Sequence, residues 1–197
     1  MRVGILAGMT GKTWREVIPE WVVPSVDDVA EYGGMAVRLE EITECVQARG
    51  QCAALCWLIG RDPAPITRRQ GLVSRDAARW ESWLALCLAA GHPGAVEEER
   101  ARLGIPQRRT DGQVPWWAHG VWRALSWLSG EHPDPPIQLP VRAADGSILP
   151  GTEVYTVTRN PGSPSWRAAE ERRERRELAE AVEWWHNVGP ATVPSGR

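Results

Sequence analysis

The chain has 197 residues, 43% of them hydrophobic, and a formal net charge of −2. This composition is typical of a globular protein, excludes wholesale disorder, and does not by itself favour a polyanionic partner. No apolar run reaches the roughly 18 residues of a membrane span. The apolar start breaks at Gly11 and Lys12 without an Ala-x-Ala cleavage signal, so we expect a cytoplasmic protein without a membrane partner.

Tryptophan dominates the aromatic residues, with 12 Trp, 2 Tyr and no Phe. Of the 23 basic residues, all but Lys12 are arginine. Both biases match GC-rich codons and indicate a high-GC bacterial or phage genome. Because each tryptophan can bury about 200 Å², we expect a core built on a few large side chains.

Residues 1–24 are predicted to form an N-terminal arm held by Trp14 and Trp21. Residues 8–13 end in Gly-Lys-Thr and suggest a phosphate-binding loop. The spacing does not fit, however, because Leu6 stands where such a loop needs a glycine. We therefore predict neither nucleotide binding nor any other cofactor.

Residues 25–132 are predicted to form a tryptophan-rich helical domain, whose helix ends are marked by glycine with proline two or three residues later. This pattern is typical of a helix that ends in a left-handed glycine. It occurs at Gly60 and Pro63, Gly91 and Pro93, Gly104 and Pro106, and Gly130 and Pro133.

The helices follow by reading back from these ends. Apolar residues at three- and four-residue steps predict one helix over residues 36–59, with a bend at Gly50. Ser74 is a candidate N-cap for the next helix, which we expect to end at Ala90.

Two further helices complete the domain. Glu97 to Glu99 are expected to open a short helix that ends at Leu103. Pro115 is predicted to lie in the first turn of a helix that ends near Ser129. Because apolar residues surround this last helix on every side, it should lie in the middle of a bundle.

An internal similarity links residues 54–60, Ala-Leu-Cys-Trp-Leu-Ile-Gly, with residues 124–130, Ala-Leu-Ser-Trp-Leu-Ser-Gly. Duplication of a helical unit would explain it. A shared way of ending a helix would also explain it, and we favour this interpretation because one weak copy is thin evidence of a repeat.

The C-terminal third is different in character. Residues 133–162 are proline-rich, and Asp145-Gly146 with the β-prone run 153–158 predicts a small β-hairpin. Residues 163–187 are predicted to form a protruding helix that is part charged and part amphipathic, followed by a flexible tail over 188–197. The apolar face of that helix supplies candidate partner-binding residues, which are Leu178, Val182 and Trp185.

The charged half of this helix does not predict phosphate binding. Residues 170–177 hold four Glu and four Arg, and Arg173 and Glu177 lie four residues apart. Such a pattern supports a solvated helix. A more basic region surrounds residues 61–79 and is the candidate nucleic-acid site. Its residues are Arg61, Arg68, Arg69, Arg75 and Arg79.

Candidate metal and catalytic residues are few. Cys52 and Cys56 are one helical turn apart and could hold zinc with Cys87 and His92. No Cys-x-x-Cys pair supports that site, so we expect reduced core thiols and no metal. His119 stands among tryptophans and is expected to be a buried, hydrogen-bonded imidazole, which leaves no predicted catalytic residue.

Two segments resemble a known set of proteins. Residues 58–67, Leu-Ile-Gly-Arg-Asp-Pro-Ala-Pro-Ile-Thr, and residues 120–131, with Pro135-Pro136 behind them, are similar to short uncharacterised proteins of actinobacteria and their phages or prophages. The resemblance spans residues 50–140 at most and implies a mobile-element or virion-related context.

We therefore expect a mainly α protein: a helical bundle with a small β-hairpin insertion and a protruding C-terminal helix. The predicted function is a non-catalytic protein–protein interaction component in phage or prophage virion or tail assembly, with a protein partner or a homo-oligomer. If the protein is a structural component of the phage, we expect it in the virion and not in the cytoplasm. The alternative is a nucleic-acid-binding accessory protein that uses the five arginines.

Overall fold

A computed structural model gives the fold. It describes residues 11–105, 114–145 and 147, together with residues 172–173, 175–180, 182–183 and 187. The described part is mainly α-helical, as predicted. Its helices are α2 (Gly11–Val17), α3 (Val26–Thr43), α4 (Val46–Leu58), α5 (Arg75–Ala89), α6 (Gly94–Arg102) and α7 (Val114–Leu128). The residues described between 172 and 187 are also helical and are called the C-terminal helix below.

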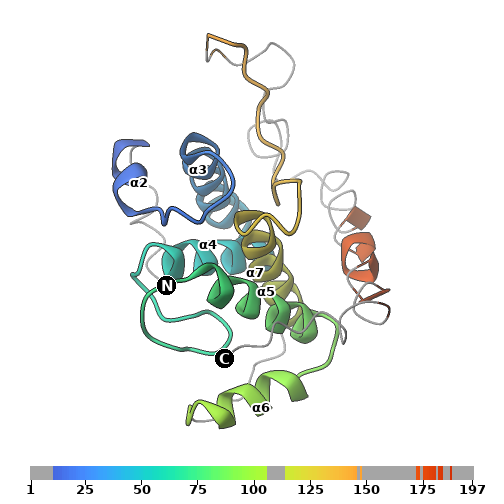
Figure 1. Cartoon of the computed structure of the whole chain (residues 1–197). Coiled ribbons are helices and arrows are strands. Elements are labelled where there is room, and N and C mark those ends of the chain that lie inside the picture. The colour runs from blue at the N-terminus through green and yellow to red at the C-terminus, as the bar shows by residue number, and fades with distance from the viewer. Residues whose placement is uncertain are drawn as a thin grey trace.

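Helix α7 lies at the centre of the bundle (Figure 1). It packs along α4 and α5, while α3 covers α4, α2 lies on α3, and α6 lies on α5. Val121, Leu125 and Leu128 of α7 are completely buried. The prediction that this helix lies in the middle of the bundle is confirmed, but its buried surface is not apolar throughout, because His119, Arg123 and Ser126 are buried on it as well.

The predicted glycine helix ends are also confirmed. Gly60, Gly91, Gly104 and Gly130 all have positive φ angles, of 71°, 82°, 67° and 78°. At each end the following N–H donates to the carbonyl five residues back, as Arg61 does to Cys56 at 2.9 Å. These bonds satisfy carbonyls that the helix itself leaves open.

The predicted single helix over residues 36–59 is wrong. Two helices occupy this region, because Glu44 adopts a left-handed conformation (φ 52°) and ends α3. Helix α3 begins ten residues earlier than predicted, at Val26, where the Ser25 hydroxyl accepts a hydrogen bond from the Asp28 N–H. Ile42 is exposed, so the apolar stripe does not run through the break.

The other helix starts are close to those predicted. Ser74 caps α5 by accepting a hydrogen bond from the Ala77 N–H at 3.1 Å. Pro115 lies in the first turn of α7. Helix α6 begins at Gly94, ahead of the predicted acidic start, and Glu97 falls within its first turn.

Both tryptophans of the N-terminal arm contact the bundle. Trp14 is 1% exposed and packs in the core against Gly33. The Trp21 indole N–H donates to the Val73 carbonyl at 2.8 Å. Residues 1–10, which include the start of the Gly-Lys-Thr segment, lie outside the described residues.

After α7, the chain leaves the helical body as an extended segment (Figure 1). Ile137 still packs in the core, and Arg142 forms an ion pair with Glu31 of α3 at 2.6 Å. The Asp145 carboxylate accepts hydrogen bonds from both the N–H and the hydroxyl of Ser147, which forms a turn at the predicted position. The rest of the predicted hairpin, through residue 162, and the tail 188–197 lie outside the described residues.

Among the described residues, no helix is both long and apolar enough to cross a lipid bilayer.

Candidate functional site

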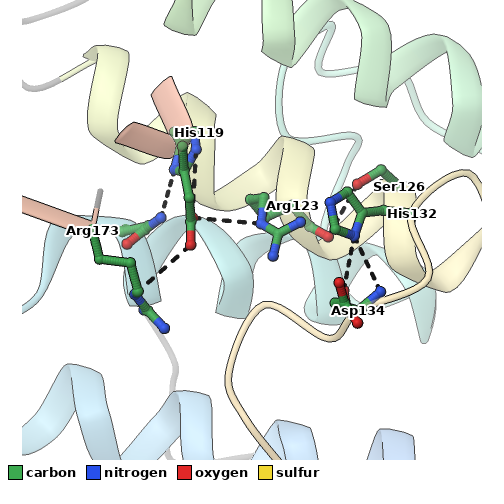
Figure 2. Close-up of polar contacts among 8 residues, drawn as sticks. His119, Arg123, Ser126, His132, Asp134 and Arg173 are labelled. Atoms are coloured by element: carbon green, nitrogen blue, oxygen red, sulfur yellow. Dashed lines mark hydrogen bonds and ion pairs between the residues drawn. The ribbon is translucent and has the colours of Figure 1, made fainter. Parts of the chain in front are cut away.

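A buried polar cluster on α7 is the most chemically distinctive part of the described structure (Figure 2). His119 and Arg123 are four residues apart and therefore lie on one face of the helix. His119 is completely buried, and its Nδ1 lies 2.5 Å from the Gln47 side-chain nitrogen on α4. The amide of Gln47 donates this bond, which fixes the plane of the ring.

The imidazole of His119 is neutral. Burial lowers its pKa to about 3, and the positive charges of Arg123 and Arg173 add to the effect. Because Nδ1 accepts a hydrogen bond, the single proton of the neutral ring belongs on Nε2. This N–H points to Glu177 of the C-terminal helix, whose Oε2 lies 3.8 Å away.

Arg123 approaches the same carboxylate from another side. Its Nε lies 3.6 Å from Glu177 Oε2, and its guanidinium lies 5.9 Å from the centre of the Trp122 ring. Arg123 is only 7% exposed, and burial lowers its pKa. From the C-terminal helix itself, Arg173 Nε lies 3.7 Å from Glu177 Oε1, which confirms the predicted pairing four residues apart. Figure 2 shows His119, Arg123 and Arg173 directed to one point between them.

Neither His119 Nε2 nor Arg123 Nε makes a hydrogen bond, although both atoms are buried. Their distances of 3.6 to 3.8 Å from Glu177 are too long for one. A carboxylate therefore sits at this point and balances charge without satisfying the two donors. The arrangement can bind an anion, but it contains no nucleophile beside a base.

The C-terminal helix meets the bundle through Glu177 and its neighbour Leu178. Leu178 is half-buried and packs against the core cluster. Val182 is half-buried as well, whereas Trp185 lies outside the described residues. Most other described side chains of this helix are exposed, and these are Arg172, Arg175, Arg176, Ala179, Glu180, Glu183 and Asn187.

The buried acid Glu81 holds a loop. The Glu81 carboxylate of α5 accepts hydrogen bonds from the Ile66 N–H at 2.9 Å, the Thr67 N–H at 3.2 Å and the Thr67 hydroxyl. Burial raises the pKa of Glu81, against the effect of these bonds. Arg100 of α6 donates to the Ile66 carbonyl from the other side. All of these contacts fix the loop between α4 and α5, so we assign Glu81 a structural role.

A cavity of about 430 Å³ lies between residues 23–24, the end of α7 and the proline-rich segment that follows it. Its lining is largely apolar, and its titratable residues are Asp28 and His132. Asp28 accepts a hydrogen bond from the Ser25 hydroxyl at 2.7 Å, and His132 Nδ1 accepts one from the Asp134 N–H at 3.1 Å. Burial lowers the pKa of His132. Both groups are therefore used in local structure, Asp28 at the start of α3 and His132 in the turn after α7.

The five arginines of the candidate nucleic-acid site differ in their contacts. The Arg75 guanidinium donates to the Ser129 carbonyl at the end of α7, at 2.8 Å. Arg79 forms an ion pair with Glu131 at 2.7 Å. Arg61 and Arg68 are exposed and Arg69 is half-buried. Two of the five therefore fasten α5 to the end of α7, and three remain on the loop.

The cysteines behave as core thiols. Cys52, Cys56 and Cys87 are buried. Burial raises the pKa of Cys52 to about 12 and that of Cys56 to about 11, so both stay protonated at neutral pH. Among the described residues, no group of three or more His, Cys, Asp or Glu side chains is placed to hold a metal ion.

The described tryptophans pack inside the protein. Each one in the described part of the chain is buried or half-buried: Trp14, Trp21, Trp57, Trp80, Trp83, Trp116, Trp117, Trp122 and Trp127. Packing inside this chain therefore accounts for the tryptophans of the described residues, and partner binding is argued from other residues.

Comparisons with protein-family models, with curated proteins and with solved structures gave no match to this chain.

Proposed function

We propose that this chain is a non-catalytic protein-binding component that presents its C-terminal helix to a partner. One observation supports this proposal above the others. A largely exposed, charged helix lies on a well-packed body and contacts it through Glu177 and Leu178. Such an amphipathic helix is a common form of protein recognition element.

The use of the other polar residues supports a binding role rather than catalysis. Glu81, Arg75 and Arg100 each bond backbone groups that hold loops or helix ends. The described hydroxyls that bond a carboxylate also serve local structure: Ser25 with Asp28 at the start of α3, Thr67 with Glu81 in the loop before α5, and Ser147 with Asp145 in a turn. On the resemblance of residues 58–67 and 120–131 to actinobacterial phage and prophage proteins, we propose virion or tail assembly as the biological setting.

A photo-crosslinking experiment tests the proposal. A photoreactive amino acid would replace Arg176, which is exposed on the C-terminal helix, and in a matched control it would replace Glu98, which is exposed on α6. We expect a discrete protein adduct from position 176 in a lysate of the source organism. An excess of unmodified chain should remove it, and position 98 should not form it.

Light scattering of the purified chain then distinguishes a second copy of this chain from another protein as the partner. Equal adducts from the two positions, or none from position 176, would contradict the proposal.

The alternative, nucleic-acid binding, has less support from the contacts. Arg75 and Arg79 are bonded to Ser129 and Glu131, so a phosphate-binding surface would have to rely on Arg61, Arg68 and Arg69. A salt-dependent shift of labelled duplex DNA that disappears in Arg68→Ala/Arg69→Ala would favour it.

A further inference from the structure

Beyond the helix itself, the surface that it covers on α7 is built to receive a carboxylate. We propose that His119 and Arg123 form a docking site for a helix-borne carboxylate, and that an acidic helix of a protein partner replaces the chain's own C-terminal helix there. This inference rests on the proposed function, because it identifies what the partner binds.

The site is organised by residues of the bundle alone. Gln47 fixes the His119 ring, and the rings of Trp116 and Trp122 lie around it, with centroid distances of 6.1 and 5.3 Å. Arg123 lies over Trp122. None of these contacts involves the C-terminal helix, so the donors keep their positions when that helix leaves. A preorganised site of this kind binds at a lower entropic cost.

The Glu177 carboxylate, which occupies the site in this chain, leaves two hydrogen-bond donors unsatisfied. His119 Nε2 and Arg123 Nε are buried, make no hydrogen bond, and lie 3.6 to 3.8 Å from Glu177 Oε2. Buried donors without partners are unfavourable. A carboxylate that lies roughly 0.6 Å or more closer would satisfy both donors, so a partner helix can compete with the resident one.

The charge of the site selects a carboxylate over a phosphate group. Arg173 belongs to the C-terminal helix and leaves with it, so the bundle side offers the single positive charge of Arg123 beside the neutral His119. A carboxylate carries one negative charge and matches this site. A phosphate monoester carries close to two and would keep an unbalanced charge next to the half-buried Trp116 and Trp122.

The resident helix also indicates the form of the partner segment. Leu178 follows Glu177 directly, and Val182 lies four residues after Leu178 on the same face. Leu178 packs on the core beside the carboxylate. We therefore expect a partner helix in which a glutamate is followed by an apolar residue and a second apolar residue one turn later.

A labelled peptide with the sequence of residues 170–187 serves as the probe, and its binding to full-length chains is followed by fluorescence anisotropy. Glu177→Ala in the chain removes the resident carboxylate and should tighten peptide binding roughly tenfold or more relative to the unmodified chain. Glu180→Ala is the matched control, since Glu180 is exposed on the same helix and the charge change is identical. Circular dichroism establishes that both variants fold.

A change in the peptide keeps the test independent of chain folding. A Glu177→Gln peptide should lose most of its binding to the Glu177→Ala chain, whereas a Glu180→Gln peptide should bind as the parent does. Equal binding of the two peptides, or equal binding by the Glu177→Ala and Glu180→Ala chains, would overturn the proposal. The measurement needs no natural partner, so its failure would leave the crosslinking result for the proposed function standing, and the reverse holds too.

Discussion

Gly50 of α4 and Gly120 of α7 lie where these two helices cross, and each faces the backbone of the other helix. A Cβ atom on Gly50 would collide with the Trp117 carbonyl oxygen, and one on Gly120 would collide with the Gln47 carbonyl oxygen. The two contacts correspond to each other, because Gly120 lies 70 residues after Gly50 and Trp117 lies 70 residues after Gln47. The helix ends obey the same shift, since the Cys56 carbonyl accepts from residues 61 and 62, and the Ser126 carbonyl from residues 131 and 132.

This symmetry bears on the similarity between residues 54–60 and 124–130. A shared way of ending a helix would account for the matching ends alone. It would not place a glycine ten residues before each end and bring the two glycines to one crossing point. The reciprocal contact therefore favours duplication of a helical unit.

Alanine at either crossing glycine should destabilise the protein. Gly50→Ala and Gly120→Ala each force a methyl group into backbone atoms, so we expect a loss of roughly 1–3 kcal/mol or more in the free energy of unfolding. Gly34→Ala is the control, because Gly34 lies within α3 and a Cβ there meets nothing within 4 Å. That substitution should stabilise the protein by about 0.5–1 kcal/mol. Urea denaturation measures all three, and a neutral Gly50→Ala would contradict the close crossing.

Local signals account for the parts of the fold that the sequence predicts. Glycine at a helix end and serine before a helix act through their own backbone and side chain, and Gly60, Gly130 and Ser74 all occupy the predicted positions. The break at Glu44 escaped prediction because a non-glycine residue takes the left-handed conformation there. The apolar pattern continues on both sides of Glu44, so it does not indicate that one helix ends there and another begins.

The candidate site depends on contacts between distant residues and was therefore only partly predictable. The sequence indicates a buried, hydrogen-bonded His119 because tryptophans surround it. It does not indicate that Gln47, 72 residues away, is the bonding partner. The charge pattern of residues 170–177 predicts a solvated Glu177, whereas its carboxylate faces Arg123 and His119. The one available signal was its position beside Leu178, a residue predicted to dock.

The Glu81 contacts predict a pH-dependent contribution to stability. Burial raises the pKa of Glu81 above its ordinary value of 4.5, so the protonated acid is the form that the folded state prefers. Its contribution is complete below that value and is lost as the pH rises through the higher folded-state pKa. Glu81→Gln resembles the protonated acid and should remove this dependence, which urea unfolding of both proteins across the acid range would measure. An unchanged pH profile would show that the carboxylate is not desolvated.

His119 should act in the opposite direction. Its pKa falls from 6.5 to about 3 on folding, so the stability due to the neutral ring is complete above pH 6.5 and is lost as the pH falls toward 3. The loss between about pH 7 and about pH 4 should reach up to about 3 kcal/mol. His119→Gln cannot titrate and can still accept the Gln47 bond, so the difference between the two unfolding curves isolates the imidazole. A difference that does not change with pH would contradict the burial of a neutral ring.

The thiols should react according to burial. Cys52 and Cys56 have pKa values of about 12 and about 11, and Cys87 is buried as well, so all three should resist iodoacetamide at mildly alkaline pH in the folded protein. Cys45 is half-buried and should react first. Mass spectrometry after alkylation should therefore show one modified thiol in the native protein and four after denaturation. Rapid labelling of Cys52 in the native state would contradict the packing of α4.

The five arginines of the candidate nucleic-acid site should divide into two groups when they are replaced by alanine. Arg75→Ala removes the donor to the Ser129 carbonyl and should lower the free energy of unfolding by about 1–2 kcal/mol, because the helix end loses a charged hydrogen bond. Arg61→Ala removes an exposed side chain and should change it by less than about 0.5 kcal/mol. Under the proposed function, neither variant alters the retention of duplex DNA, since the unmodified chain does not bind it appreciably at physiological salt. Salt-dependent DNA binding that falls in Arg61→Ala, with the stability intact, would instead establish the loop as a nucleic-acid-binding surface.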